Sequence, residues 1–399
     1  MAEQHEKALV PQIRFTGFTD PWEQRKLGEV ASGFEYGLNA AASDFDGEKK
    51  YLRITDIDDQ TREFRTDDLS SPDINNPIDD RYLLKEGDIL FARTGASVGK
   101  TYLYKASDGK TYYAGFLIRA HVSDEADAGF IFQSTLTERY KQFVLLTSQR
   151  SGQPGINAQE YSDLLLPLPS LMEQRRIGAF FDRLDSLITL HQRKYDKLCV
   201  LKKSMLDKMF PKGGSLYPEI RFAGFTDPWE QRKVQDVADR FDNLRIPVAA
   251  NLRVHGKTPY YGANGIQDYV DGFTHDGEFV LVAEDGANDL KNYPVKCVNG
   301  RIWVNNHAHV LQGKAGIADN SFLAFAISQS DIESLLVGGG RAKLNAETLM
   351  SIEFRLPCLQ EQHQIGEYLT RLDHLITLHQ RKLELLRNIK KSMLDKMFV

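Results

Sequence analysis

The residues of this chain that could carry out chemistry do not complete a catalytic motif. Gly95, Gly99, Lys100 and Thr101 resemble part of a phosphate-binding loop, but Thr94 stands where the GxxxxGK[ST] pattern requires its first glycine. The Tyr-Leu-Tyr run that follows predicts a strand, whereas a phosphate-binding loop leads into a helix. We therefore interpret this segment as a β-turn that carries a basic side chain.

Metal chemistry has little support in the sequence. His307 and His309 occupy alternate positions of a strand-like run, so they are candidates for a metal pair, for a strand edge or for polar groups that read bases. The three cysteines have no CxxC spacing for zinc, and no methyltransferase or dinucleotide-binding motif occurs. We predict no metal site and no catalytic residue.

The composition narrows the class of protein. A chain of 399 residues with 42% hydrophobic and 26% charged residues indicates two or three folded domains. Few cysteines, no apolar leader and no run of about 18 apolar residues predict a cytoplasmic protein that does not enter a membrane. The net charge of −5 argues against an overall basic nucleic-acid binder.

These residues lie in a chain that repeats itself. Residues 11–31 match residues 218–238 at 16 of 21 positions, and residues 168–210 match residues 356–398 at 28 of 43 positions. The sequences between the matched segments differ from one copy to the other. Two long copies do not make a solenoid, so we predict a duplicated frame that holds one private insert per copy.

The second repeated segment predicts a long helix in each copy. Ser170 and Glu173 form a capping-box pattern, and apolar residues then recur in heptads. Such a helix would be about 50 Å long. The predicted seam consists of Ile177, Leu184, His191, Leu198 and Met205 in the first helix and Ile365, Leu372, His379, Leu386 and Met393 in the second.

An amphipathic helix of this length needs a partner, and the simplest partner for each helix is the other. Parallel pairing would require residues 211–238 to span about 50 Å, so we favour an antiparallel pair. His191 and His379 are then either a polar register key or ordinary histidines tolerated at the seam. The same arrangement predicts that Phe398 lies close to the N-terminal segment.

Both inserts predict mixed, β-rich domains. A turn, an apolar strand and a second turn run over residues 87–95 and again over residues 277–286. Each insert ends in a related signature, at residues 152–157 and 340–345. The predicted fold class is α+β, with two globular α/β domains held apart by two long helices that form an antiparallel coiled coil, in a pseudo-twofold internal repeat.

This order of parts resembles the specificity subunit of type I restriction–modification systems. The match covers nearly the whole chain, and its motifs recur in the same order twice. The resemblance rests on the Phe-Thr-Asp-Pro-Trp entry at 18–22 and 225–229, the Leu-Pro-x-Leu-x-Glu-Gln helix start at 168–174 and 356–362, the Lys-Lys-Ser-Met-Leu-Asp-Lys-Met-Phe helix end, and the runs 261–265 and 304–311.

The resemblance implies how the chain divides into domains and which functions belong to this chain or to its partner subunits. It implies a first target recognition domain at 1–167 (with the repeat segment 11–31), a first spacer helix at 168–217, a second target recognition domain at 218–355 and a second spacer helix at 356–399. Each recognition domain would bind one half of a bipartite double-stranded DNA site, and the helices would set the spacing. Two modification (methyltransferase) subunits would dock on the frame, and restriction subunits would join the full complex. S-adenosylmethionine, ATP and Mg²⁺ would bind those partners, and this chain would hold no cofactor.

No DNA-reading motif can be carried over from the family, so the site prediction rests on residue chemistry. Arg and Lys beside glycine turns reach phosphates, whereas Asn, Gln and Arg read base edges. The predicted DNA-binding residues are Arg93, Thr94, Lys100, Gln153 and Asn157 in the first insert and Asn264, Asn288, Lys291, Arg341 and Lys343 in the second.

The distribution of charge changes the meaning of the net value. The insert Ser32–Pro167 carries −7 and the insert Asp239–Arg355 carries −3, while the helix regions are basic. We therefore expect the chain alone to bind DNA poorly and its partners to supply much of the phosphate contact. A competing hypothesis is a scaffold that joins two protein partners without nucleic acid. An enzyme with one active site per insert is disfavoured, because the inserts share no catalytic constellation.

Overall fold

The computed structural model describes residues 9–74, 77–338 and 342–399. Contacts divide the chain into two compact units, a first made of Met1–Arg193 with Gln380–Val399 and a second made of Lys194–His379. The predicted helices are α5, Leu171–Met209, and α9, Leu359–Met397, each of 39 residues. Each helix therefore begins in one unit and ends in the other.

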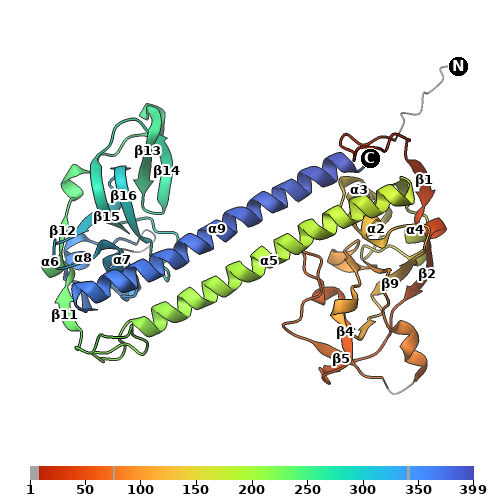
Figure 1. Ribbon diagram of the computed structural model, residues 1–399, viewed down its shortest axis with the longest axis horizontal. Coiled ribbons are helices and arrows are strands. Elements are labelled where there is room, and N and C mark those ends of the chain that lie inside the picture. Colours follow the sequence, from red (N-terminus) through yellow and green to blue (C-terminus); the bar gives the residue numbers. More distant parts are fainter. Residues whose placement is uncertain (1–8, 75–76, 339–341) are drawn as a thin grey trace. The chain divides into compact units, whose positions relative to one another are not determined.

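The helices pair in opposite directions within each unit. In the first unit the end of α9 lies beside the beginning of α5 (Figure 1), and Lys390 Nζ is 2.6 Å from Asp185 Oδ1. In the second unit the end of α5 lies beside the beginning of α9, and Lys202 Nζ is 2.5 Å from Asp373 Oδ1. The two ion pairs are equivalent in the sequence repeat, which confirms the antiparallel prediction.

The predicted seam is most deeply buried near the beginning of each helix. Ile177, Leu184, Ile365 and Leu372 are buried. The remaining seam residues are half-buried: His191, Leu198, Met205, His379, Leu386 and Met393. The apolar stripe therefore packs against each unit's globular core at the helix start and is more open further along.

The first unit is built on a four-stranded antiparallel sheet in the order β2-β9-β6-β7, accompanied by the small ribbons β3-β5 and β4-β8. Its buried core includes aromatic residues of β6, β7 and β8, such as Phe91, Tyr102 and Tyr113. The elements are β1 Glu23–Lys26, α1 Leu27–Val30, β2 Ala31–Tyr36, β3 Ala42–Asp44, β4 Lys50–Leu52, β5 Ser70–Pro72, β6 Asp88–Ala92, β7 Thr101–Leu103, β8 Thr111–Tyr113, β9 Leu117–Val122, α2 Ala128–Ser134, α3 Glu138–Thr147, α4 Ala158–Ser162 and β10 Leu165–Leu168.

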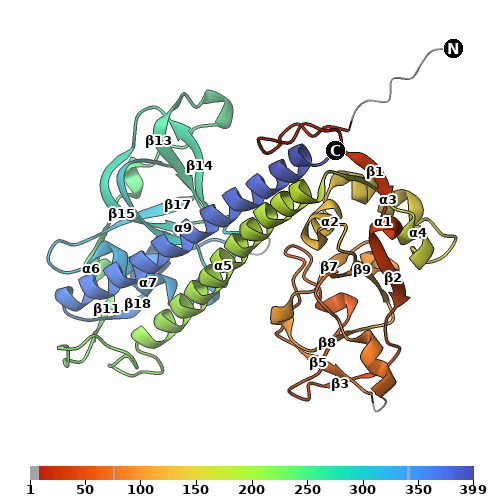
Figure 2. The same ribbon diagram turned by 45° about the vertical axis from the view of Figure 1, so that its right-hand side comes forward.

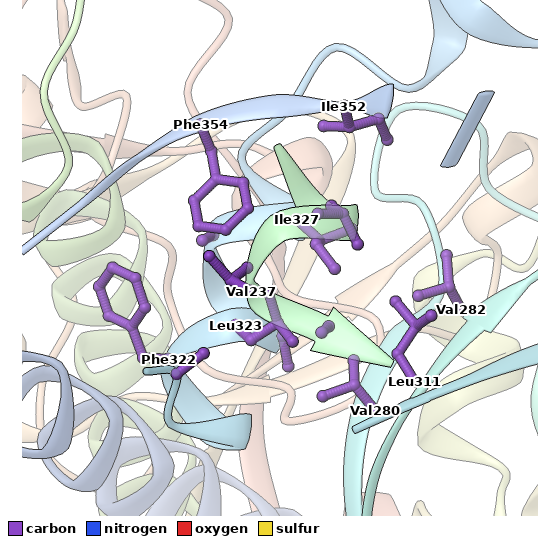
Figure 3. Close-up of a cluster of buried hydrophobic side chains, with 14 of the residues drawn as sticks. Val237, Val280, Val282, Leu311, Phe322, Leu323, Ile327, Ile352 and Phe354 are labelled. Carbon is purple, nitrogen blue, oxygen red and sulfur yellow. The ribbon is translucent and has the colours of Figure 1, made fainter. Parts of the chain in front are cut away.

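The second unit is built on a six-stranded sheet in the order β12-β17-β15-β16-β13-β14, in which only the contact between β13 and β16 is parallel among the described strands. Figure 3 shows Val280, Val282 and Leu311 of this sheet packed against Phe322 and Leu323. The elements are β11 Glu230–Lys233, α6 Val234–Val237, β12 Ala238–Arg240, β13 His255–Gly262, β14 Gly265–Val270, β15 His275–Ala283, β16 Val295–Val304, β17 Ala308–Gly313, α7 Asn320–Ser328, α8 Ala346–Ser351 and β18 Glu353–Leu356.

The repeated sequences build the same frame in both units. The Glu-Gln-Arg-Lys run forms β1, which pairs antiparallel with β10, and the same run in the second copy forms β11, which pairs with β18. The strands β10 and β18 come directly before the long helices. The end of each insert is thus a strand that ties the insert to its frame.

Aromatic residues close each frame. In the first unit the Phe398 ring lies 6.2 Å from the Trp22 ring and 5.0 Å from the Phe130 ring. In the second unit the Phe210 ring lies 6.0 Å from the Trp229 ring and 5.5 Å from the Phe322 ring. The end of α9 lies next to β1 in both views (Figures 1 and 2), which confirms that Phe398 is close to the N-terminal segment.

The beginning of each helix is anchored by a buried ion pair. Arg14 donates from Nε and Nη2 to the two carboxylate oxygens of Glu173, each at 2.7 Å, and Arg221 binds Glu361 in the same way at 2.7 Å. The capping-box prediction is therefore only half right. Ser170 Oγ accepts a 3.4 Å hydrogen bond from Glu173 N, but the Glu173 carboxylate binds Arg14 instead of returning to the helix start.

A glycine in each long helix makes room for a helix cap. Asp127 caps α2 by accepting a 2.8 Å hydrogen bond from Phe130 N, and Asp319 caps α7 in the same way. A Cβ on Gly178 would lie 2.2 Å from Asp127 Oδ1, and one on Gly366 would lie 2.7 Å from Asp319 Oδ1. Only glycine allows the long helix to approach the cap this closely.

Candidate DNA-recognition interface

In the first unit, two loops that are distant in the sequence lie together. Ile156 N donates to Arg93 O at 2.9 Å, and Thr94 pairs with Gly155 in an antiparallel bridge. One loop follows strand β6 and the other precedes helix α4. The structure thereby brings together four of the residues predicted to bind DNA: Arg93, Thr94, Gln153 and Asn157.

Arg93 is held against aromatic rings. Its Cζ lies 4.8 Å from the centroid of the Tyr36 ring and 6.0 Å from that of the Phe116 ring. Its backbone N donates to Phe116 O at 3.1 Å. A guanidinium that lies over an aromatic face can still donate hydrogen bonds, because its N–H groups point outward in the plane of the guanidinium itself.

The other residues of these loops are exposed or shape the loop. Gln153 is exposed beside Gly95. Asn157 starts α4 with a full capping box, because its Oδ1 accepts from Glu160 N at 2.9 Å and its N donates to Glu160 Oε2 at 2.8 Å. Thr94 Oγ1 lies 3.4 Å from Pro154 O. Asn157 therefore has a structural role whether or not it touches DNA.

Lys100 is used inside the domain. It is only 8% exposed, its Nζ donates to Ile57 O at 3.0 Å, and it forms an ion pair with Asp59 at 2.5 Å. The turn prediction for this segment agrees with the short 3-10 turn Gly95–Ser97 and the strand β7 that follows. A phosphate contact by Lys100 would require this ion pair to break.

In the second unit the corresponding loops also meet. Asn264 Oδ1 accepts a 3.0 Å hydrogen bond from Asn288 N. Lys343 pairs with Asp285 in an antiparallel bridge, and its Nζ lies 2.8 Å from Glu284 Oε1. Asn264, Asn288 and Lys343 thus surround the loop that follows β15.

Two predicted residues are not joined to this group. Lys291 is exposed, and its backbone N donates to Asp289 Oδ1 at 3.0 Å. Arg341 lies outside the described residues. Their contact with DNA stays a prediction.

A buried charged cluster supports the loop of the second unit, and the sequence did not reveal it. His309 Nδ1 lies 2.7 Å from Asp242 Oδ2, and its Nε2 lies 2.9 Å from Leu344 O. Arg245 Nη1 donates to Glu284 Oε2 at 2.7 Å. The only sequence signal was His309 itself, since Asp242 lies 67 residues away.

The carboxylates of this cluster are stabilised in their charged form. Burial raises the pKa of Asp242, but hydrogen bonds from His309 and from the backbone N of Val310, together with the charge of Arg245, outweigh it and lower the pKa overall. Burial likewise raises the pKa of Glu284, and hydrogen bonds from Lys343 and Arg245 lower it overall. The loop after β15 is therefore anchored by ionised groups.

The two loop systems are equivalent in position and different in chemistry. Ile156 N donates to Arg93 O in the first unit, and Leu344 N donates to Glu284 O at 2.7 Å in the second. In both, the accepting residue directly follows a central strand of the sheet. The frame thus places an arginine at this point in one unit and a glutamate in the other.

The described residues offer no metal centre. Within the described ranges, no group of three or more His, Cys, Asp or Glu side chains could hold a metal ion. His307 and His309 instead bind separate carboxylates, since His307 Nδ1 lies 2.6 Å from Asp285 Oδ1. No helix in the described part of the chain is long and apolar enough to cross a membrane.

Known proteins are similar to this chain in sequence. The family model described as the type I restriction modification DNA specificity domain matches residues 19–199 and 226–388. A Haemophilus influenzae protein named as a type I restriction enzyme specificity subunit is 44% identical over 146 residues, which span 37% of this chain and 38% of that protein. The type I restriction enzyme MjaVIII specificity subunit of Methanocaldococcus jannaschii is 21% identical over 78% of both chains.

A solved structure shares the fold of this chain. The type I restriction–modification S subunit from M. genitalium covers 98% of this chain and 99% of its own, with a TM-score of 0.74 and 13% sequence identity. At this identity the likeness supports the fold alone, and it agrees with the predicted two-insert, two-helix architecture.

Proposed function

Because the chain belongs to the type I restriction–modification specificity family, we propose that each of its two insert domains recognises one half of a bipartite DNA sequence. Specificity subunits are the non-catalytic members of these systems. The observation that carries the proposal is the pair of equivalent loop systems, one after β6 and one after β15. The same backbone placement with different side chains is what two different half-sites require.

The long helices would set the spacing between the half-sites. A continuous helix of 39 residues extends over about 58 Å, and one added heptad lengthens it by about 10 Å, or about three base pairs of DNA. We expect a heptad added to both helices to lengthen the gap in the recognised sequence by about that amount. An unchanged gap in the enriched DNA would contradict this role.

An exposed apolar stripe on the helices would dock two modification subunits. The first unit exposes Leu187, Leu190 and Ile389, and the second unit exposes their repeat equivalents Leu375, Leu378 and Leu201. The side chains of each equivalent pair are similarly exposed: 46% for Leu187 and 40% for Leu375, 46% for Leu190 and 40% for Leu378, and 36% for Ile389 and 37% for Leu201. In the first unit Thr189 donates to Glu63 of the insert domain at 2.9 Å. At 3.6 residues per turn, Leu187 and Leu190 point at least about 100° away from Thr189.

Paired substitutions test this docking. Leu187→Glu with Leu190→Glu should remove one modification subunit, and Leu375→Glu with Leu378→Glu should remove the other. Native mass spectrometry of the purified complex counts the subunits. Met172→Glu is a matched control, because Met172 is 72% exposed but not part of the stripe. Two bound subunits in both double variants would refute the docking surface.

The remaining chemistry would belong to the partners. We propose that S-adenosylmethionine binds the modification subunits, that ATP and Mg²⁺ bind restriction subunits in the full complex, and that the assembly works in the cytoplasm. The acidic inserts, at −7 and −3, support a division in which partners supply much of the phosphate contact. Tight, specific DNA binding by the chain alone would count against this division.

Selection on randomised duplexes tests the function itself. The complex with modification subunits should enrich two short motifs separated by a fixed gap. The alternative function, a scaffold that joins two proteins, predicts subunit assembly without enrichment of any sequence. Replacing Ser32–Pro167 with an unrelated insert should change one motif and leave the other intact.

A further inference from the structure

We propose that Arg93 reads a guanine in the half-site bound by the first insert domain, with Nη1 and Nη2 donating to the O6 and N7 atoms of that base. The inference rests on the proposed DNA-recognition function and assigns one base contact within it. Arginine paired with these two guanine acceptors is the commonest specific contact in the major groove.

The position of Arg93 is fixed before DNA arrives. Its backbone N donates to Phe116 O at 3.1 Å, and its backbone O accepts from Ile156 N at 2.9 Å. Its guanidinium lies over the Tyr36 ring at 4.8 Å and near the Phe116 ring at 6.0 Å. A side chain held in this way loses little conformational entropy when it binds, which is the condition for specific readout.

The guanidinium has no acceptor of its own within the described residues. Its Nε is buried without a hydrogen-bond partner, and neither Nη donates to a described residue. Four other arginines of this domain are paired with carboxylates, namely Arg53 with Asp56, Arg65 with Asp67, Arg119 with Glu35 and Arg150 with Glu160, whereas Arg81 bonds the Tyr82 hydroxyl and Arg139 the Val399 carbonyl. In a domain with a net charge of −7, an arginine kept away from carboxylates is available to an external acceptor.

The surroundings of Arg93 suit a base edge. Tyr36 and Phe116 are 43% and 59% exposed, so the guanidinium lies at the surface between aromatic groups. Thr94 and the exposed Gln153, on the two loops joined here, can bind neighbouring base edges or phosphates. This combination of a fixed arginine with polar neighbours forms a recognition surface rather than a simple basic patch.

The second unit shows that the frame does not require this arginine. Glu284 holds the equivalent backbone position there, with Leu344 N donating to its O at 2.7 Å. Its carboxylate is bound by Arg245 and Lys343, at 2.7 and 2.8 Å. Arg93 therefore occurs in the first insert but not at the equivalent position of the second, as is required of a residue that determines only one half-site.

The test compares Arg93→Ala and Arg93→Lys with the unaltered chain, all in complex with modification subunits, by selection on randomised duplexes. We expect both variants to lose the preference for guanine at one position of one motif, and to bind the original sequence roughly ten- to a hundredfold more weakly. Lysine should not restore the preference, because it lacks the planar fork. Arg65→Ala, which alters an exposed arginine paired with Asp67, should leave both motifs unchanged.

Salt dependence separates base readout from phosphate contact. A base contact leaves the slope of log affinity against log salt unchanged, whereas loss of a phosphate contact lowers its magnitude by about one. If an Arg93 variant kept the motif but showed a shallower salt dependence of its affinity, Arg93 would contact a phosphate and the proposal would be overturned. If both the motif and the salt dependence were unchanged, Arg93 would not contact DNA and the proposal would also be overturned. An intact second motif in the variants shows that they fold. If the unaltered chain enriched no split motif, the proposed function would fail instead.

Discussion

Removal of the Phe398 ring should open the first frame without disturbing the second. Phe398 packs on Phe130, Phe181 and Trp22 with ring centroids 5.0, 5.9 and 6.2 Å apart. Three aromatic pairs at the low end of their range contribute about 1.5 kcal/mol beyond burial, and the lost apolar area of a partly exposed ring contributes about 1.5 kcal/mol more. Phe398→Ala should therefore destabilise the first unit by about 3 kcal/mol, the lower limit for Phe→Ala in a core.

Two equivalent amides provide a local assay. Ile13 N donates to Lys396 O in the first unit, and Ile220 N donates to Lys208 O in the second, both at 2.9 Å. If opening of the frame controls exchange, 3 kcal/mol speeds hydrogen exchange at Ile13 by about a hundredfold. Phe398→Ala should accelerate hydrogen exchange at the Ile13 amide and leave exchange at the Ile220 amide unchanged.

Phe210→Ala is the matched control and should give the reverse pattern, because Phe210 packs on Trp229 and Phe322 in the second unit. Equal acceleration at Ile13 and Ile220 in either variant would show that the frames do not close independently. No acceleration at Ile13 in Phe398→Ala would show that the ring does not hold the frame, and either result refutes the reasoning.

Four further substitutions follow from the buried contacts. Glu173→Gln leaves Arg14 without its charged partner and should destabilise the first unit by about 3 kcal/mol, measured by urea unfolding, and Glu361→Gln should do the same to the second. Lys100→Met leaves Ile57 O unsatisfied, so it should cost about 1–3 kcal/mol in the same assay while both DNA motifs persist. A lost motif in a folded Lys100→Met protein would assign Lys100 to DNA instead. The pKa of Asp242 is lowered in the fold, so its contribution to stability is present above the unfolded pKa of about 4 and is lost as pH falls through the lower folded value. Asp242→Asn should therefore be less stable than the unaltered chain at pH 7, and the difference should shrink below about pH 4 in pH-dependent unfolding; a constant difference would contradict this.

The architecture could be predicted from sequence because its signals are repeated or periodic. The heptads predicted the helices, and the need of each helix for a partner predicted that they pair. The short connection 211–238 predicted that the pairing is antiparallel. The position of Phe398 followed from the same duplication, since the helix ends that carry Phe210 and Phe398 have identical sequences. These inferences required only patterns that recur within one chain.

The candidate recognition loops were predicted only in part, because their contacts are not local. The bridge between Thr94 and Gly155 joins residues far apart in the chain, and the paired glycine-rich signatures were its only trace. Lys100 shows the limit of residue type as a guide. A lysine beside a glycine turn has the sequence of a phosphate contact, yet its Nζ is bound by Ile57 O and Asp59 inside the domain.

The repeated frame would allow one chain to hold the two specificities that we propose for it. Its fixed parts are the closing ring of Phe398 or Phe210 and the ion pair of Glu173 or Glu361, which are the same in both units. The position after the central strand is also fixed, since its backbone accepts the same hydrogen bond in both units. Its side chain is not fixed, because one unit has an arginine there and the other a glutamate. In the first unit the Arg93 side chain contacts Tyr36 and Phe116, which belong to the insert itself, so we expect its replacement to leave the frame intact.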